Sequence, residues 1–201
     1  MIRILLIRHG ETILLGQTLY GRMPGVELSA KGLRQAETLA RSLKRRFHLA
    51  EVISSPMERT RETARFIANA FNLPLLIDEG FNEIDCGVWM GKQFNHLQRL
   101  ESWTAYNRHR SLAHPPGGES MMDVQSRAWA GIERIANRHQ GKNEVTVAVV
   151  THGDVIRSLL LLFLGIPGDL IHRIEVGPGS VTEVALYGLQ PRVISMNRDS
   201  D

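Results

Sequence analysis

Two histidines, each placed directly after an apolar run, are the residues of this sequence best suited to chemistry. His9 lies in the segment RHGET (8–12) after the run ILLI (4–7), and His152 lies in THGD (151–154) after VTVAVV (145–150). A neutral imidazole can attack an electrophile or carry a proton near neutral pH. The arginine that precedes His9 indicates that the group attacked is an anion.

Two further segments, SSPMER (54–59) and FNEID (81–85), add to RHGET (8–12) the groups that the hydrolysis of a phosphate monoester would need. The reaction requires a nucleophile, positive charge around the phosphoryl oxygens and a proton donor for the leaving oxygen. Arg8 and Arg59 could supply the charge, and Gly10 permits close approach of the backbone. Glu83, in the segment FNEID (81–85), is our candidate for the general acid.

The elements that must position these groups alternate between strands and helices. Apolar runs predict strands at residues 2–8, 52–54, 73–77 and 144–151, and a closing hairpin of residues 181–187 and 191–196. Helices are predicted at residues 30–46, from Pro56 to 71, in one or two pieces up to 110, from Glu119 onward, and from Asp154. For the first helix we expect Ser29 as N-cap and one apolar face made of Leu33, Ala36, Ala40, Leu43 and Phe47.

This alternation indicates an α/β fold, a three-layer sandwich in which helices flank a mainly parallel sheet. The length of 201 residues favours one domain over residues 1–201. Long glycine-rich loops predict a small cap over the sheet edge at residues 80–118. Because the carboxyl ends of parallel strands meet at one edge, we expect His9 and His152 to lie close together there.

Composition excludes several other classes of protein. The net charge of +3 is spread along the chain, so we expect no nucleic-acid partner. The single cysteine, Cys86, allows no internal disulfide and fits a reducing, cytoplasmic location. The longest apolar stretch, residues 159–164, is too short to span a bilayer, so we expect no membrane partner.

With these residues the chain resembles the histidine phosphatase superfamily, the phosphoglycerate mutase-like enzymes. Five blocks follow the order of that family: RHGET (8–12), SSPMER (54–59), Glu83 with GVWMG (87–91), PGGES (116–120) and THG (151–153). The resemblance implies that His9 becomes phosphorylated, Arg59 grips phosphate, Glu83 donates the proton and His152 is the second catalytic histidine. It also places Arg8 and Gly153 at the substrate, and it implies neither a metal nor a cofactor.

The chain departs from the family pattern shortly after its first block. Many members carry Trp-Asn there, and the asparagine contacts phosphate, whereas this sequence reads Ile13-Leu14-Leu15-Gly16. Leu15 therefore stands where that polar contact is expected. Arg22, in the following loop, is our candidate for a replacement.

Each candidate has a structural alternative. His152 could be a hydrogen-bonded residue at a helix N-terminus, and Arg59 could be a surface charge paired with Glu58 or Glu62. Glu83 competes with Glu79 and Asp85, which lie in the same loop. The remaining side chains of interest are three tryptophans, interpreted as packing residues, and two histidines that could line the pocket mouth: Trp89, Trp103, Trp129, His96 and His109.

The sequence lacks the motifs of other hydrolases. It has no His-Glu-x-x-His zinc motif, no P-loop and no Gly-x-Ser-x-Gly elbow. We therefore interpret the chain as a metal-independent phosphatase that hydrolyses a small phosphorylated metabolite through a phosphohistidine intermediate. A cofactor-dependent phosphoglycerate mutase and a non-catalytic phosphate-binding module are the alternatives, and a homodimer is left open.

Overall fold

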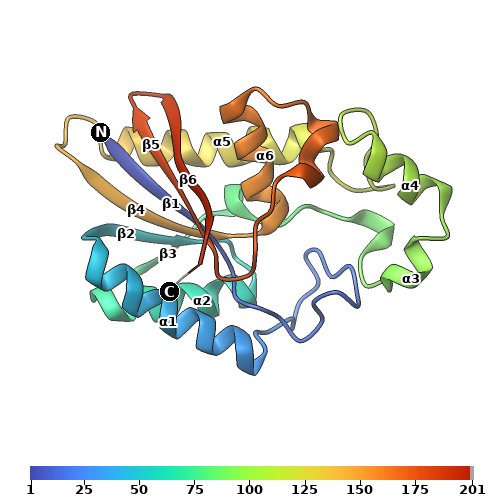
Figure 1. Cartoon of the computed structure of the whole chain (residues 1–201), viewed down its shortest axis with the longest axis horizontal. Helices are drawn as coiled ribbons and strands as arrows, with labels where there is room; N and C mark the ends of the chain where they lie inside the picture. The colour runs from blue at the N-terminus through green and yellow to red at the C-terminus, as the bar shows by residue number, and fades with distance from the viewer. Residues whose placement is uncertain (200–201) are drawn as a thin grey trace.

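Six strands form one mixed sheet in the computed structural model, which describes residues 1–199 (Figure 1). The strand order is β3-β2-β4-β1-β5-β6. Strands β1 to β4 pair in parallel, whereas β5 runs antiparallel to both β1 and β6. The predicted α/β sandwich with a mainly parallel sheet is confirmed. The bounds are β1 Ile2–Arg8, β2 Leu49–Ser54, β3 Leu75–Ile77, β4 Val145–Thr151, β5 Val181–Tyr187 and β6 Gln190–Arg198.

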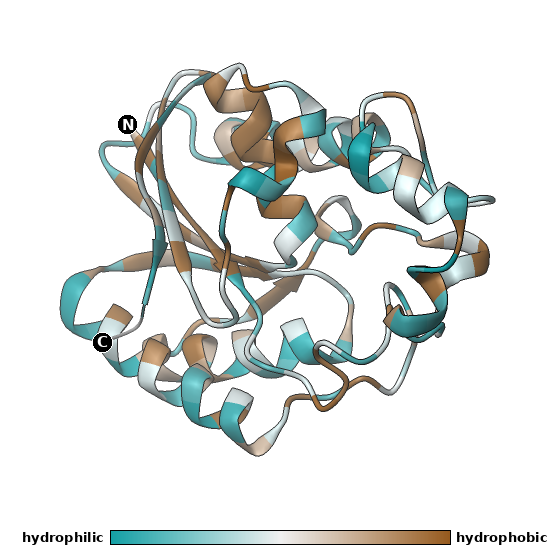
Figure 2. Ribbon diagram, turned by 45° about the vertical axis from the view of Figure 1, so that its right-hand side comes forward, coloured by the Kyte–Doolittle hydropathy of each residue, from teal (hydrophilic) through white to brown (hydrophobic). Residues whose placement is uncertain are grey.

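The two central strands, β1 and β4, are apolar on both sides because helices cover both faces of the sheet. Leu5 and Ile7 point to one buried cluster, and Ile4 and Leu6 point to the other. Every residue of β4 is buried. In Figure 2 the brown strands of the sheet lie between the two helix layers.

One layer consists of α1 (Ala30–Arg46) and α2 (Glu58–Phe71), and the other of α5 (Met121–Arg138) and α6 (Gly153–Leu164) (Figure 1). The first helix has its predicted bounds, and its predicted N-cap Ser29 accepts a hydrogen bond from the N–H of Gly32. Leu33, however, is 42% exposed, so its placement on the buried face is wrong. Gly32 faces inward at this turn, against the backbone of Glu11, and the next residue therefore points to solvent.

Two other predicted helix starts are displaced. Helix α2 begins at Glu58, with Met57 as an extended N-cap, so Pro56 lies in the turn before the helix. The hydroxyl of Ser55, between the end of β2 and this turn, is hydrogen-bonded to His152. Helix α5 begins at Met121, where the side chains of Ser120 and Asp123 form a capping box.

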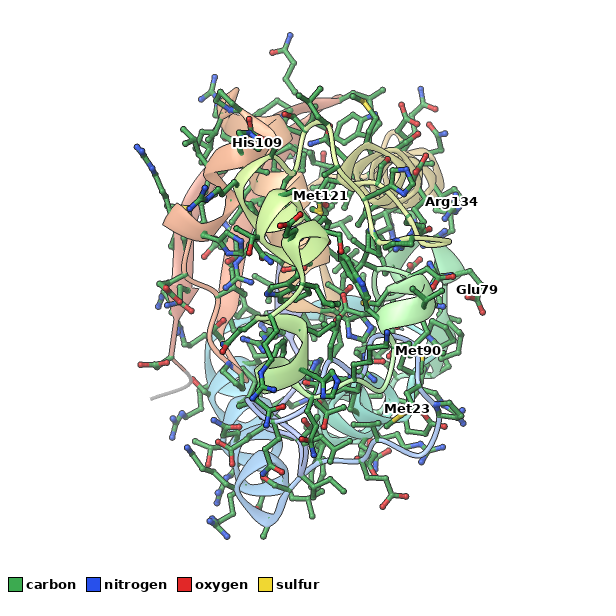
Figure 3. All side chains as sticks on the ribbon, turned by 90° about the vertical axis from the view of Figure 1, so that its right-hand side faces the viewer. Met23, Glu79, Met90, His109, Met121 and Arg134 are labelled. Atoms are coloured by element: carbon green, nitrogen blue, oxygen red, sulfur yellow. The ribbon has the colours of Figure 1, made fainter. Side chains whose placement is uncertain are left out.

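The cap lies between β3 and α5, as the sequence predicts for residues 80–118. It contains the short helices η1 (Glu79–Phe81), η2 (Gly87–Trp89), α3 (Phe94–Leu97) and α4 (Glu101–Arg108). Figure 3 looks onto the molecule from the cap side, with His109 labelled where α4 ends. A further short helix, η3 (Gly168–Arg173), follows α6 and borders the same region.

Within residues 1–199, no helix combines the length and apolar character that crossing a membrane requires.

Candidate functional site

His9 follows β1 directly and is 2% exposed. Its Nδ1 lies 2.7 Å from the carbonyl oxygen of Gly10. Because a carbonyl oxygen only accepts, Nδ1 carries the proton and Nε2 keeps its lone pair. Burial, with the charges of Arg59 and Arg8, holds the pKa of His9 well below its usual range, so the ring is neutral at physiological pH. This is the protonation state that a nucleophilic imidazole requires.

His152 stands beside His9, with ring centroids 5.3 Å apart. The parallel register brings them together, because Arg8 at the end of β1 pairs with Thr151 at the end of β4. The predicted meeting of the two histidines at one sheet edge is confirmed. Nδ1 of His152 lies 3.2 Å from Nη2 of Arg59, and Nε2 lies 2.7 Å from Oγ of Ser55. Since a guanidinium only donates, His152 is neutral here and donates from Nε2 to Ser55.

Arg59 lies in the first turn of α2, and its side chain is completely buried. One guanidinium nitrogen donates to the carbonyl of Gly21 at 2.7 Å, while Nε and Nη1 have no partner. The alternative of a surface charge paired with Glu58 or Glu62 is therefore wrong. Buried unpaired donors on a cation are costly, and a bound anion would satisfy them.

Arg8 supplies a second cation at the same edge. Its Nη1 donates to the carbonyl of Val176 at 2.6 Å, and its Nε is buried without a partner. A Cβ atom on Gly153 would lie 3.4 Å from this Nε, so the glycine allows Arg8 to approach the N-terminus of α6. Helix N-termini favour anions, which adds to the attraction of the two arginines.

Glu83 reaches the site from the cap. Its Oε2 lies 3.4 Å from Nδ1 of His152 and 3.9 Å from Nη2 of Arg59. Burial raises the pKa of Glu83 to about 7, an effect that Arg59 opposes and the charge of Asp154 supports. A carboxyl group that is still protonated near neutral pH suits a general acid.

The competing carboxylates of the same loop are engaged elsewhere. Glu79 accepts a hydrogen bond from the amide of Asn82, and Asp85 accepts one from the N–H of Gly87. Neither lines the pocket that contains His9 and Glu83. Of the three candidates, Glu83 is the one that lines this pocket.

Arg22 lies outside that pocket, and the structure does not bring it to His9. Its Nε donates to the backbone carbonyl of Glu83 at 2.8 Å, and its Nη2 donates to Glu119 at 2.8 Å. With these donors engaged, Arg22 positions the loop of Glu83 and does not fill the place of the contact that Leu15 lacks. Arg127, which the sequence did not single out, donates to the same carbonyl and to that of Asn82.

The pocket in front of His9 has a volume of about 350 Å³. Arg8, Glu83 and Gly153 line it together with His9, while Arg59 and His152 lie behind them with fully buried side chains. Four charged or titratable side chains that the sequence analysis missed also line it: Arg110, Asp154, Arg157 and His172. His96 and His109 do not, so their prediction as residues of the pocket mouth is wrong.

His172 was missed because η3, not a neighbouring stretch of sequence, carries it to the pocket. Its Nε2 lies 3.2 Å from the side-chain oxygen of Asn107, from the end of α4. Within residues 1–199, no group of three or more histidine, cysteine, aspartate or glutamate side chains has the arrangement of a metal site.

The two opposing pKa shifts predict a bell-shaped dependence of kcat/KM on pH. Activity rises on the acid side as His9 loses its proton, and because its pKa is lowered this limb lies below the usual range of histidine. Activity falls on the alkaline side as Glu83 deprotonates, at about pH 7. Initial rates measured across pH with a monoester of an alkyl alcohol check both limbs. An alkaline limb well above pH 9 would contradict the assignment of Glu83 as the acid.

The chain belongs to the histidine phosphatase superfamily (branch 1), which it matches over residues 4–199. Phosphoserine phosphatase 1 from Hydrogenobacter thermophilus is 32% identical over 168 residues, which cover 83% of this chain and 78% of that protein. Bifunctional protein Rv2228c from Mycobacterium tuberculosis is 34% identical over 187 residues, 92% of this chain. This chain spans only half the length of that relative.

Solved structures show the same fold over almost the whole chain. Bacillus stearothermophilus YhfR is 30% identical, with a TM-score of 0.88 and coverage of 96% of each chain. A phosphoserine phosphatase mutant from Entamoeba histolytica, solved in complex with phosphoserine, is 26% identical, with a TM-score of 0.84. The alignment of the two structures covers 98% of this chain and 97% of that chain.

Proposed function

We propose that this protein hydrolyses small phosphate monoesters through a phosphohistidine intermediate on His9. The observation that carries the proposal is the environment of this ring. Its Nδ1 proton is fixed by Gly10, and its ring lines a pocket beside Arg8 and in front of Arg59, both of which hold buried donors without a partner. A nucleophile with its lone pair free, next to cations that lack a partner, is an arrangement for attack on an anionic centre.

In the first step, Nε2 of His9 forms a bond to phosphorus while the bond from phosphorus to the leaving oxygen breaks. Glu83 gives its proton to that oxygen, so the alcohol leaves neutral and Glu83 becomes a carboxylate. Arg8 and Arg59 hold the phosphoryl oxygens. His152 accepts from Arg59 at Nδ1 and donates from Nε2 to Ser55, so it holds the guanidinium in place.

In the second step, water attacks the phosphohistidine. Glu83 accepts a proton from this water, the bond from phosphorus to His9 breaks, and inorganic phosphate leaves. Each group then has its starting protonation state, so one carboxyl serves as acid and base in turn.

The alternative function is that of a phosphoglycerate mutase, and one relative of this chain carries that name. Phosphoglycerate mutase-like protein 4 from Arabidopsis thaliana is 32% identical over 160 residues, which cover 78% of this chain and 68% of that protein. A mutase must keep its phosphohistidine from water and bind a second anionic group of the same substrate. Leu15 lines the pocket where many family members place asparagine, which removes one polar contact.

We therefore expect phosphate release to exceed the interconversion of 3- and 2-phosphoglycerate. Both reactions should be measured on one preparation, with 2,3-bisphosphoglycerate present as phosphoryl donor. Release from several monoesters should be faster than mutase turnover by at least about tenfold, because water reaches the intermediate. Mutase turnover that exceeds phosphate release by orders of magnitude would refute the phosphatase assignment.

Activity should also survive excess chelator. Arginines and histidines supply the charge in the proposed mechanism, so no divalent ion is needed at the phosphoryl group. Phosphate release should be compared before and after dialysis against EDTA, with a magnesium-dependent phosphatase as control. Loss of activity that a divalent ion restores would disprove metal independence.

A further inference from the structure

The pocket continues beyond His9 into a region where apolar side chains are left partly exposed. Leu15 and Leu19 come from the loop after β1, and Phe94 and Trp103 come from α3 and α4. None of the four is fully buried, in contrast to the neighbouring Trp89, which is 2% exposed. Apolar surface that faces a pocket is available to an apolar part of a ligand.

Backbone hydrogen bonds join the two halves of this apolar wall. The N–H of Leu19 donates to the carbonyl of Lys92 at 2.9 Å, and the N–H of Gly91 donates back to Leu19 at 2.8 Å. The N–H of Phe94 donates to the carbonyl of Gln17 at 3.1 Å. The loop and the cap are therefore fixed to each other, and the wall exists before any ligand arrives.

Aromatic packing holds Trp103 in place. Its ring meets Trp89 edge-on, with centroids 5.3 Å apart, and meets Phe94 at 6.1 Å. Tyr106 packs against both tryptophans from the buried side. Trp103 is only partly buried and also lines the pocket, so it offers a rigid aromatic surface to a ligand.

The charged side chains at the other end of the pocket are largely engaged with each other. Arg110 and Arg157 both pair with Asp154, at 3.3 Å and 3.1 Å. Arg157 also donates from Nε to the carbonyl of Ile174, and Arg110 donates to the hydroxyl of Tyr106. A second anionic group on the substrate would have to compete with the Asp154 carboxylate for these arginines.

We propose that the pocket selects phosphate monoesters of alcohols with a ring-sized apolar body, which packs against Leu15, Phe94 and Trp103 while the phosphate lies at His9. This inference rests on the proposed phosphatase function and names its substrate class. The pocket volume of about 350 Å³ accommodates a ring together with a phosphoryl group. Leu15, which replaces a polar family residue, then determines specificity through contact with the apolar body.

The test compares aliphatic esters, of which 2-phenylethyl and ethyl phosphate have leaving alcohols of similar acidity, so that the difference in rate between these two reports on the pocket. We use 2-phenylethyl phosphate, ethyl phosphate and phosphoserine, and measure kcat/KM for phosphate release. Burial of the ring should favour 2-phenylethyl phosphate over ethyl phosphate by roughly 10- to 100-fold. The kcat/KM for 2-phenylethyl phosphate should also exceed that for phosphoserine. Equal rates for the three esters, or a preference for phosphoserine, would overturn the inference and leave the phosphatase function standing.

Substitutions in the apolar wall test whether its side chains cause the preference for 2-phenylethyl over ethyl phosphate. Leu15→Asn should lower the ratio of kcat/KM for 2-phenylethyl over ethyl phosphate by about tenfold, since it places an amide against the ring. Leu112→Asn is the matched control, because Leu112 is 86% exposed and lies outside the pocket, and its ratio should match the wild type. Trp103→Ala should lower the ratio as well. If Trp103→Ala does not fold, the ratio measured for Leu15→Asn alone tests whether the wall sets the preference. If no ester releases phosphate and no phosphohistidine forms, the proposed function itself is wrong.

Discussion

His9→Ala is expected to abolish turnover while the protein stays folded. In the proposed mechanism the covalent step depends on the lone pair of Nε2 of His9. The other histidine that lines the pocket, His172, has its Nε2 3.2 Å from the side-chain oxygen of Asn107. His152, the nearest candidate, has Nε2 bonded to Ser55 and Nδ1 bonded to Arg59. We expect kcat to fall by roughly 10⁴-fold or more, as for other nucleophile deletions.

Three measurements check this result. Phosphate release gives the rate, circular dichroism shows that the fold is kept, and rapid quenching with labelled substrate tests for a phosphoryl group on His9. The control is His96→Ala, which removes an exposed histidine outside the pocket and should keep normal activity. More than a few per cent of wild-type activity in His9→Ala, or label on another residue, would disprove the assignment.

The sequence predicted the sheet and the two histidines well because both depend on local patterns. Apolar runs of strand length identified β1 and β4, and parallel strands necessarily bring their carboxyl ends to one edge. His9 and His152 each follow such a run directly, so their meeting required only that β1 and β4 be neighbours.

The contacts that hold Glu83 in place were not predictable in the same way. Arg22 and Arg127 both donate to the carbonyl of Glu83, yet they lie 61 and 44 positions away from it in the sequence. Arg127 is one arginine among several polar residues of α5, and nothing in its neighbourhood marks it. A contact between a side chain and a distant backbone oxygen leaves no periodic signal.

The pocket wall was missed for a related reason. Trp103 was interpreted as a packing residue, and it does pack against Trp89, but its remaining surface also lines the pocket. Sequence reasoning places a residue on a helix face and does not show which part of a large ring stays open. His172 reaches the pocket because η3 lies against the end of α4, where its Nε2 contacts Asn107.

Glu83→Gln is expected to slow the hydrolysis of an ester more when its leaving group needs a proton in order to depart. Glutamine keeps the size of the side chain but has no acidic proton to give. For an alkyl phosphate, kcat/KM should fall by about 10²- to 10⁴-fold, the usual contribution of a general acid. For p-nitrophenyl phosphate the fall in kcat/KM should be much smaller, because p-nitrophenolate leaves without protonation.

The second chemical step separates this role from a merely structural one. In the proposed mechanism Glu83 also accepts the proton of the attacking water, so Glu83→Gln should accumulate phosphohistidine with p-nitrophenyl phosphate and show a burst of p-nitrophenol followed by slow turnover. The alkaline limb near pH 7 should disappear from the kcat/KM profile, since the group responsible for it is gone. Glu79→Gln, a change in a carboxylate of the same loop that does not line the pocket, should keep both the limb and the rates. An equal loss for the two esters, with the alkaline limb retained, would mean that another group protonates the leaving oxygen and that Glu83 only supports the cap.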